Sequence, residues 1–235
     1  MLKDVLTSTA LIAGCWLCSC TANGQTPTVG LINHVIGSED DGYVLFAPLR
    51  SDTTYLVDKC GKEIHKWPSG YTPGMSTFLM PDGSILRTEA ISNPVFSTTG
   101  AAGGRLERID WNGAVSWSYQ VSDSLRTQNH DVCPFPNGDI LVCVWEAIST
   151  DSAIAAGRAP SLLGTSLWSA SLLELQPVGA GSANIVWEWH LWNHVVQDQD
   201  STKQNYGVVA DHPELVNLNF VGTGAPTNPD WVHLN

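Results

Sequence analysis

Apolar and polar residues alternate along much of the chain from residue 43 onward, and this period of two predicts short β-strands. The alternation is clear at 43–46, 54–57, 63–67, 115–119 and 185–189, and the last three segments carry aromatic side chains on one face. Gly and Pro are frequent between the segments, as expected for tight turns. No long amphipathic helix pattern occurs after residue 30. The pattern therefore predicts an all-β fold.

One segment of the chain recurs. Residues 81–86 (PDGSIL) return as residues 136–141 (PNGDIL), and each copy reads as the turn and second strand of a hairpin. The recurring unit continues with a further strand, an Asp-x-x-Gly turn and a strand that ends in aromatic residues. Such a four-stranded unit of about 40–50 residues is typical of a β-propeller blade. We therefore predict a β-propeller of four-stranded blades, with a long loop inserted at 149–166.

The two copies of the repeat differ at one informative position. Six residues before the proline of the turn, the first copy has Met75 and the second has His130. A histidine at one fixed place in a repeated unit indicates that a shared scaffold carries chemistry there. The second turn reads as a two-residue hairpin loop at 137–138. This register pairs Cys133 with Val142 and leaves Cys133 and Cys143 on opposite faces of the hairpin.

Composition and charge narrow the class of protein. The 235 residues allow one or two domains, and the net charge of −12 argues against nucleic acid or an anionic membrane as a partner. Residues 5–20 are largely apolar but too short to span a bilayer, and a small-residue cleavage site follows at 22–24. We predict a signal peptide at 1–24, with a lipoprotein box at 12–15 as the alternative. The expected propeller domain at 25–235 is then exported to the periplasm, the cell surface or the medium.

Three segments carry a resemblance to a known family: 128–132 with the turn at 136–141, 187–219, and 230–235. They resemble the secreted branch of the bacterial arylsulfotransferases, the aryl-sulfate sulfotransferases, over nearly all of the chain after residue 40. The resemblance implies a six-bladed propeller with a central active site, of which this sequence is the N-terminal portion with about four blades. It also implies ping-pong transfer of a sulfuryl group from a phenolic sulfate ester to a second phenol through a sulfated histidine. The ester and the phenol are the implied partners, and no cofactor is required.

The resemblance also implies roles for particular residues. His130 and His233 match histidines that line the sulfuryl site and form the predicted catalytic pair, since histidines can donate to sulfuryl oxygens and protonate a departing phenolate. Asn235 matches a neighbouring polar contact with substrate. Apart from the resemblance, His194 is a secondary candidate for substrate binding in the channel. The family's nucleophilic histidine and sulfate-binding arginine correspond to positions after Asn235, so the sequence is expected to be inactive by itself.

The remaining histidines have simpler interpretations. His65 and His190 lie in or directly after aromatic strands and are predicted to pack there, and His212 reads as a loop or capping residue. Asp198 and Asp200 are too few carboxylates for a calcium loop. No metal site is therefore predicted.

Two other functions are compatible with the sequence. A non-catalytic propeller that binds a ligand or partner at the cell surface would share the fold, because a fold does not define a function. A quinoprotein-like oxidoreductase is suggested by the turns at 58–61 and 110–113 before aromatic strands. The second function would need adjacent cysteines or a set of calcium-binding carboxylates, and the sequence offers neither.

Overall fold

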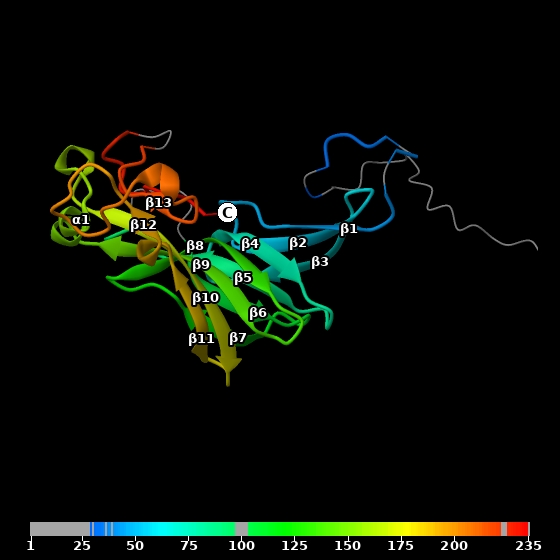
Figure 1. The fold of residues 1–235 in the computed structure, drawn as a ribbon. Coiled ribbons are helices and arrows are strands. Elements are labelled where there is room, and N and C mark those ends of the chain that lie inside the picture. Colours follow the sequence, from blue (N-terminus) through cyan, green and yellow to red (C-terminus); the bar gives the residue numbers. More distant parts are fainter. Residues whose placement is uncertain are drawn as a thin grey trace, which may run out of the picture.

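A computed structural model describes residues 29, 31–35, 37–38, 40–96, 103–221 and 225–234. In this part of the chain, three antiparallel sheets follow one another along the sequence (Figure 1). The first has three strands: β1 (Tyr43–Phe46), β2 (Thr53–Asp58) and β3 (Glu63–Pro68). The second has four: β4 (Pro73–Leu79), β5 (Ile85–Ala90), β6 (Gly104–Ile109) and β7 (Val115–Gln120). The third also has four: β8 (Arg126–Pro134), β9 (Ile140–Ile148), β10 (Leu167–Val178) and β11 (Ser182–His190).

Strands that are consecutive in the sequence are neighbours in every one of these sheets. The four-strand unit read from the repeat is thus found twice, and the prediction of an all-β fold with propeller-like blades is confirmed. A short parallel pair, β12 (Val195–Val196) with β13 (Val216–Asn217), follows the third sheet. No helix in the described ranges is long and apolar enough to cross a membrane. The signal peptide predicted at 1–24 lies outside the described residues.

Three hairpin turns in the second and third sheets share one geometry. Three residues lie between the closing backbone pairs Met80–Ser84, Asp110–Ala114 and Phe135–Asp139. The third residue of each loop is a glycine whose φ lies between 82° and 95°. A three-residue hairpin loop requires a left-handed residue at that place, and glycine adopts this conformation without steric cost. The Pro-Asp-Gly, Asp-x-x-Gly and Pro-Asn-Gly sequences are therefore variants of one turn.

This geometry corrects the register expected for the third sheet. The loop predicted as a two-residue turn at 137–138 has three residues, so Cys133 pairs with Leu141 and not with Val142. Cys133 and Cys143 are both free thiols. Burial raises the pKa of the Cys143 thiol to about 11, which keeps it protonated at neutral pH.

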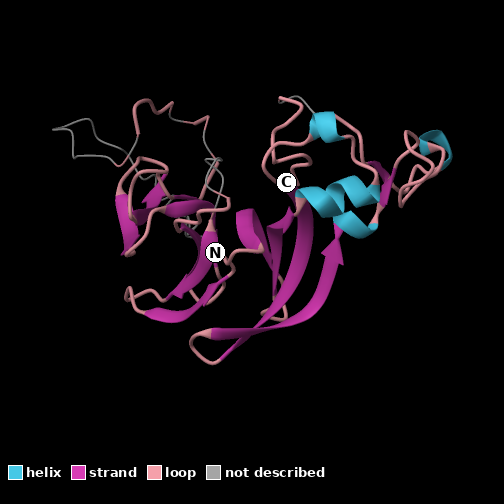
Figure 2. Ribbon diagram, turned by 90° about the vertical axis from the view of Figure 1, so that its left-hand side faces the viewer, coloured by secondary structure: helices cyan, strands magenta, loops and turns pink. Residues whose placement is uncertain are grey.

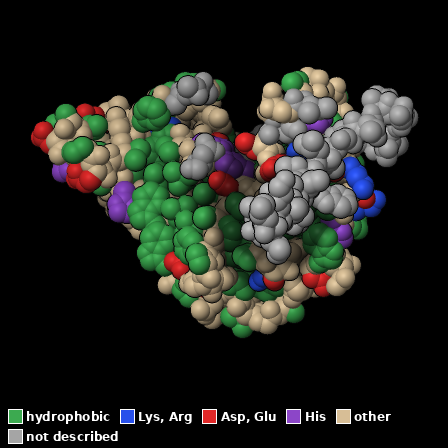
Figure 3. Space-filling view, turned by 90° about the vertical axis from the view of Figure 1, so that its right-hand side faces the viewer, with side chains coloured by type: hydrophobic (Ala, Val, Ile, Leu, Met, Phe, Trp, Pro, Cys, Tyr) green, Lys and Arg blue, Asp and Glu red, His purple; other side chains and the backbone are tan. Residues whose placement is uncertain are grey.

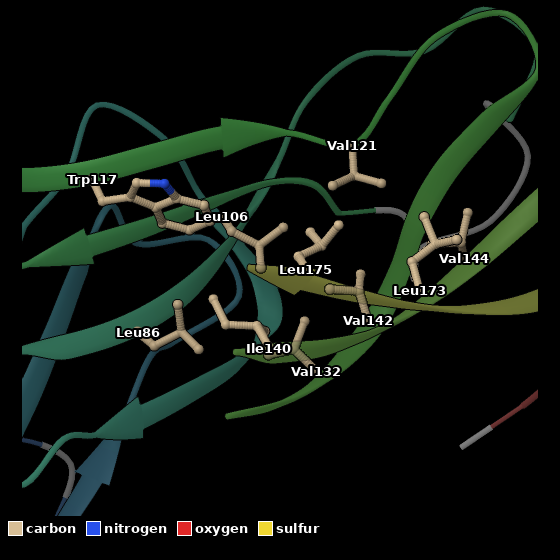
Figure 4. Close-up of a cluster of buried hydrophobic side chains, with 10 residues drawn as sticks. All are labelled: Leu86, Leu106, Trp117, Val121, Val132, Ile140, Val142, Val144, Leu173 and Leu175. Carbon is tan, nitrogen blue, oxygen red and sulfur yellow. The ribbon is translucent and has the colours of Figure 1, made fainter. Parts of the chain in front are cut away.

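Apolar side chains between the second and third sheets form the largest core of the described chain, shown in Figure 4. Its buried members are Leu86, Leu106, Trp117, Val121, Val132, Ile140, Val142, Val144, Leu173 and Leu175. Burial of one such aliphatic side chain is worth about 1.5–3 kcal/mol. This core holds the two sheets together and brings β4 beside β8.

The insertion at 149–166 is not simply a loop. It contains the helix α1 (Thr150–Ala156) and a 3-10 turn at Pro160–Leu162, and Figure 2 shows helical segments gathered at one end of the sheets. Ser149 caps α1, because its Oγ accepts a hydrogen bond from the Ser152 N–H (3.1 Å). The interpretation of this segment as a loop missed the helix because only two of its seven residues are buried.

Two arginines and two glutamates form a largely buried cluster beside the first sheet. Arg87 and Glu89 are fully buried and 3.2 Å apart (Nε to Oε1), and Arg105 Nε lies 3.0 Å from Glu107 Oε1. Ser69, which follows β3, donates to Glu89 and to Glu107. Burial raises the pKa of Glu89 to about 8, and the neighbouring Glu107 acts in the same direction, whereas Arg87 opposes the shift.

This shift makes the free energy of unfolding depend on pH. The folded state binds a proton at Glu89 more tightly than the unfolded state does, so stability should fall as pH rises from about 4.5 to about 8, by at most about 5 kcal/mol. Glu89→Gln should remove this part of the slope, because glutamine does not ionise. Urea denaturation at several pH values measures the effect, with the more exposed Glu63→Gln as the control. An unchanged slope in Glu89→Gln would contradict the assignment.

Candidate functional site

The first strand of each four-stranded sheet contains a β-bulge, and the candidate site lies at one of these bulges. In the β8–β9 pair, Gln128 faces Val144 and Val132 faces Val142, so the three residues 129–131 stand opposite Cys143 alone. The β4–β5 pair has the same irregularity between Pro73 and Thr77. Bulges re-aim side chains and often adjoin active sites. His130 is the central residue of the β8 bulge.

Polar side chains replace the ladder hydrogen bonds that the β8 bulge interrupts. Asn129 Oδ1 accepts from the His130 N–H (2.7 Å), and Asp131 Oδ1 accepts from the Val132 N–H (2.9 Å). Asp131 Oδ1 also accepts from Ser76 Oγ on β4 (2.8 Å), which ties the two bulges together. Gln128 is fully buried and its Oε1 accepts from the Gly104 N–H. The polar run in 128–131 therefore satisfies a buried, irregular backbone.

The second half of the site is the segment 230–233, which lies against the start of β10. Trp168 donates its backbone N–H to the Pro229 carbonyl (2.7 Å), and an isolated bridge joins Trp168 to Asp230. Trp231 is buried, and its Nε1–H donates to the Phe220 carbonyl (3.0 Å). These contacts fix the segment that carries His233.

Arg158, in the insertion, supports the same segment. Its guanidinium carbon lies 5.1 Å from the centre of the Trp231 ring, and its Nη1 donates to the Leu218 and Phe220 carbonyls. Arg158 is 2% exposed, and burial lowers its pKa. The helical insertion thus positions the chain before His233, a role that sequence patterns do not reveal.

The two predicted catalytic histidines meet. His130 Nε2 lies 3.0 Å from His233 Nε2, and His233 Nδ1 lies 2.7 Å from Asp230 Oδ2. The ring of the buried Trp145 packs edge-on against the His233 ring, with centroids 5.6 Å apart. Figure 3 shows histidine and acidic side chains in a hollow of the surface. His233 is exposed and His130 is half-buried, so the pair is open to a ligand.

The acceptor Asp230 determines how protons are placed in this chain of three groups. An ionised carboxylate only accepts hydrogen bonds, so His233 carries a proton on Nδ1. The facing Nε2 atoms of His233 and His130 form a hydrogen bond only if one proton lies between them. If both Nε2 atoms carried a proton, two donors would face each other. If neither carried one, two lone pairs would face each other. A hydrogen bond across this 3.0 Å contact therefore requires a single proton between the two Nε2 atoms.

A pocket of about 480 Å³ opens beside His233. Its wall combines the guanidinium of Arg158 and the carboxylate of Asp230 with apolar surface from Phe220 and Trp231. A volume of this size is in the range of small-molecule sites.

The predicted substrate contact His194 is not joined to the pair. His194 stacks on Trp189 (centroids 5.1 Å apart) and caps the 3-10 turn Leu191–Asn193 after β11, and β11 is the opposite edge of the sheet from β8. Asn235 lies outside the described residues. The structure thus unites His130 with His233 and places His194 elsewhere.

Three further histidines have structural partners. His65 stacks on Trp111 (4.0 Å between centroids), as predicted for a packing residue. His190 makes an ion pair in place of simple packing: its Nδ1 lies 2.9 Å from Glu146, and this contact raises its pKa. His212 caps the 3-10 turn Val209–Asp211 and contacts Glu214, in line with its predicted role. Among the described residues, no three or more His, Cys, Asp or Glu side chains are grouped to hold a metal ion.

Comparisons with known proteins add little to this description. No model of a protein family matches the sequence, and no curated protein matches it. Among solved structures, the hydrazine synthase of Kuenenia stuttgartiensis is similar over 61% of this chain and 40% of its own chain, at 14% identity and a TM-score of 0.34. The matched region is thus less than half of that chain, and a similarity this low carries no argument about activity.

Asp230→Asn should disturb the placement of protons without removing the site. The asparagine amide can donate to Nδ1, so His233 would no longer be held with its proton on that atom. Nitrogen-15 chemical shifts of His233 should report Nδ1–H in the parent protein and a mixture of tautomers in the variant. His212 provides the internal control. Identical His233 shifts in both proteins would show that Asp230 does not set the tautomer.

Proposed function

We propose that this chain supplies sulfuryl-binding histidines of an exported aryl-sulfate sulfotransferase. The observation that carries the proposal is the 3.0 Å contact between His130 Nε2 and His233 Nε2. These are the two residues that the sequence resemblance assigns to the sulfuryl site, and they are 103 positions apart. A structural role does not require two histidines to face each other at an open hollow.

The shared proton suits the pair to an anion. If the pair takes up a second proton, the hydrogen bond between the two Nε2 atoms is lost and both become donors. An anionic sulfuryl group can then accept from both Nε2–H groups, one of which belongs to an imidazolium. Hydrogen bonds from charged donors to an oxyanion are short and strong. Asp230 offsets part of the added positive charge. Binding of the anion should accordingly be coupled to proton uptake.

The proposed reaction balances with these groups as donors. In the first half, a histidine nitrogen attacks sulfur, the N–S bond forms, and the S–O bond to the aryl group breaks. The bonding electron pair stays on the phenolate oxygen, which takes a proton from an imidazolium group. In the second half, an acceptor phenol gives its proton to the imidazole that was deprotonated in the first half, its oxygen attacks sulfur and the N–S bond breaks, which frees the nucleophilic histidine. By the resemblance, His130 and His233 stabilise the sulfuryl oxygens and exchange protons, and a different histidine is the nucleophile.

Titration of the chain with 4-nitrophenyl sulfate tests the proposal. His130→Ala and His233→Ala should each weaken binding about 10–100-fold, because a hydrogen bond to a charged group is worth about 1.5–3 kcal/mol. Calorimetry in buffers of different ionisation enthalpy should report proton uptake in the parent protein. His212→Ala is the matched control, since it removes a half-exposed histidine from a loop.

Equal weakening by His212→Ala would mean that the loss is not specific to the pair. Absence of any binding to the parent protein would contradict the proposal. The alternative function, a propeller that binds without catalysis, predicts a different result in a protein that contains the nucleophile. There the aryl sulfate would bind through both histidines, and no phenol would be released when an acceptor is added.

A further inference from the structure

Met75 occupies, in the second sheet, the place that His130 occupies in the third. Both residues are central in a bulge where three residues stand opposite one, between Pro73 and Thr77 in β4 and between Gln128 and Val132 in β8. The repeat in the sequence therefore corresponds to a repeat in backbone geometry. The residue at this position is re-aimed by the bulge in both sheets.

The two bulges lie at the same level of neighbouring strands. Ser76 Oγ donates to Asp131 Oδ1 (2.8 Å), and these residues immediately follow Met75 and His130. The strands β4 and β8 are in contact. Met75 and His130 thus each precede a residue that takes part in a hydrogen bond between β4 and β8.

Met75 is unfavourable in the free protein for two reasons. Its φ is 85°, in the left-handed region that only glycine adopts without strain, and Asn205 is the one other described residue besides glycine with a positive φ. Its side chain is also 50% exposed. Thr88 holds the bulge through hydrogen bonds with the Ser76 backbone. Backbone strain of this kind is typical of ligand-binding positions.

We propose that Met75 determines specificity for an aromatic ligand: its thioether forms the wall that contacts the ring of an anion held by His130 and His233. The inference rests on the proposed function of that pair. Methionine is flexible and polarisable, and its sulfur makes favourable contacts with aromatic rings. The histidines then recognise the anionic head, and Met75 recognises the group attached to it.

The test compares two ligands with the same head, 4-nitrophenyl sulfate and methyl sulfate, by calorimetry. The parent protein should prefer the aromatic ligand. Met75→Ala and Met75→Gly should each weaken 4-nitrophenyl sulfate about 3–10-fold, in proportion to a lost sulfur–aromatic contact, and leave methyl sulfate unchanged. Met75→Gly alone should also raise the melting temperature by about 2–4 °C, because it relieves the strained φ. Leu79→Ala, which shortens another exposed apolar side chain on β4, is the matched control.

The outcomes separate this inference from the function on which it rests. If both sulfates bind through His130 and the Met75 variants keep the aromatic preference, the role of Met75 is wrong and the proposed function stands. Equal weakening of both ligands by Met75→Ala would indicate damage to the site and also overturns that role. If neither sulfate binds the parent protein, both the proposed function of the histidine pair and the proposed role of Met75 are wrong.

Discussion

The packing of the second sheet against the third is the contact on which the candidate site depends. Side chains such as Leu86 and Leu106 from one sheet interlock with Val142 and Leu175 from the other. This apolar contact brings β4 beside β8, and the Ser76–Asp131 hydrogen bond then aligns the two bulges. The hydrophobic contact, which has no preferred direction, therefore holds the two sheets together. The directional Ser76–Asp131 hydrogen bond then fixes the position of one strand along the other.

One histidine of the site lies on a strand, and the other lies on a segment that the insertion at 149–166 supports. His130 stands on a strand whose irregular backbone is satisfied by its own polar neighbours. His233 belongs to a segment with no regular structure, held by the buried Trp231 and Arg158. The two segments meet in one hydrogen bond, between His130 Nε2 and His233 Nε2. Asp230 accepts from His233 Nδ1 and so determines which nitrogen of His233 carries its proton.

Much of the fold was predictable because turns and strands leave local signals. The Pro-Asp-Gly and Pro-Asn-Gly turns and the alternation of residues located most strands, and the repeat located His130. The bulges were not predictable, because an alternating pattern cannot show that three residues face one. The turn at 136–138 was read one residue too short for a similar reason, since glycine fits both loop lengths. Arg158 and Asp230 gain their roles from contacts distant in the sequence, although the polar run at 128–131 inside a strand was a visible sign of irregular backbone.

Nitrogen-15 NMR tests whether His130 and His233 share one proton. In histidine-labelled protein, a hydrogen bond between the two Nε2 atoms transmits a scalar coupling between their nitrogen-15 nuclei. The expected result is a coupling between the Nε2 of His130 and the Nε2 of His233, which disappears in His130→Ala and on binding of sulfate. Two uncoupled Nε2 signals in the folded protein, each with its own proton or each without one, would contradict the claim.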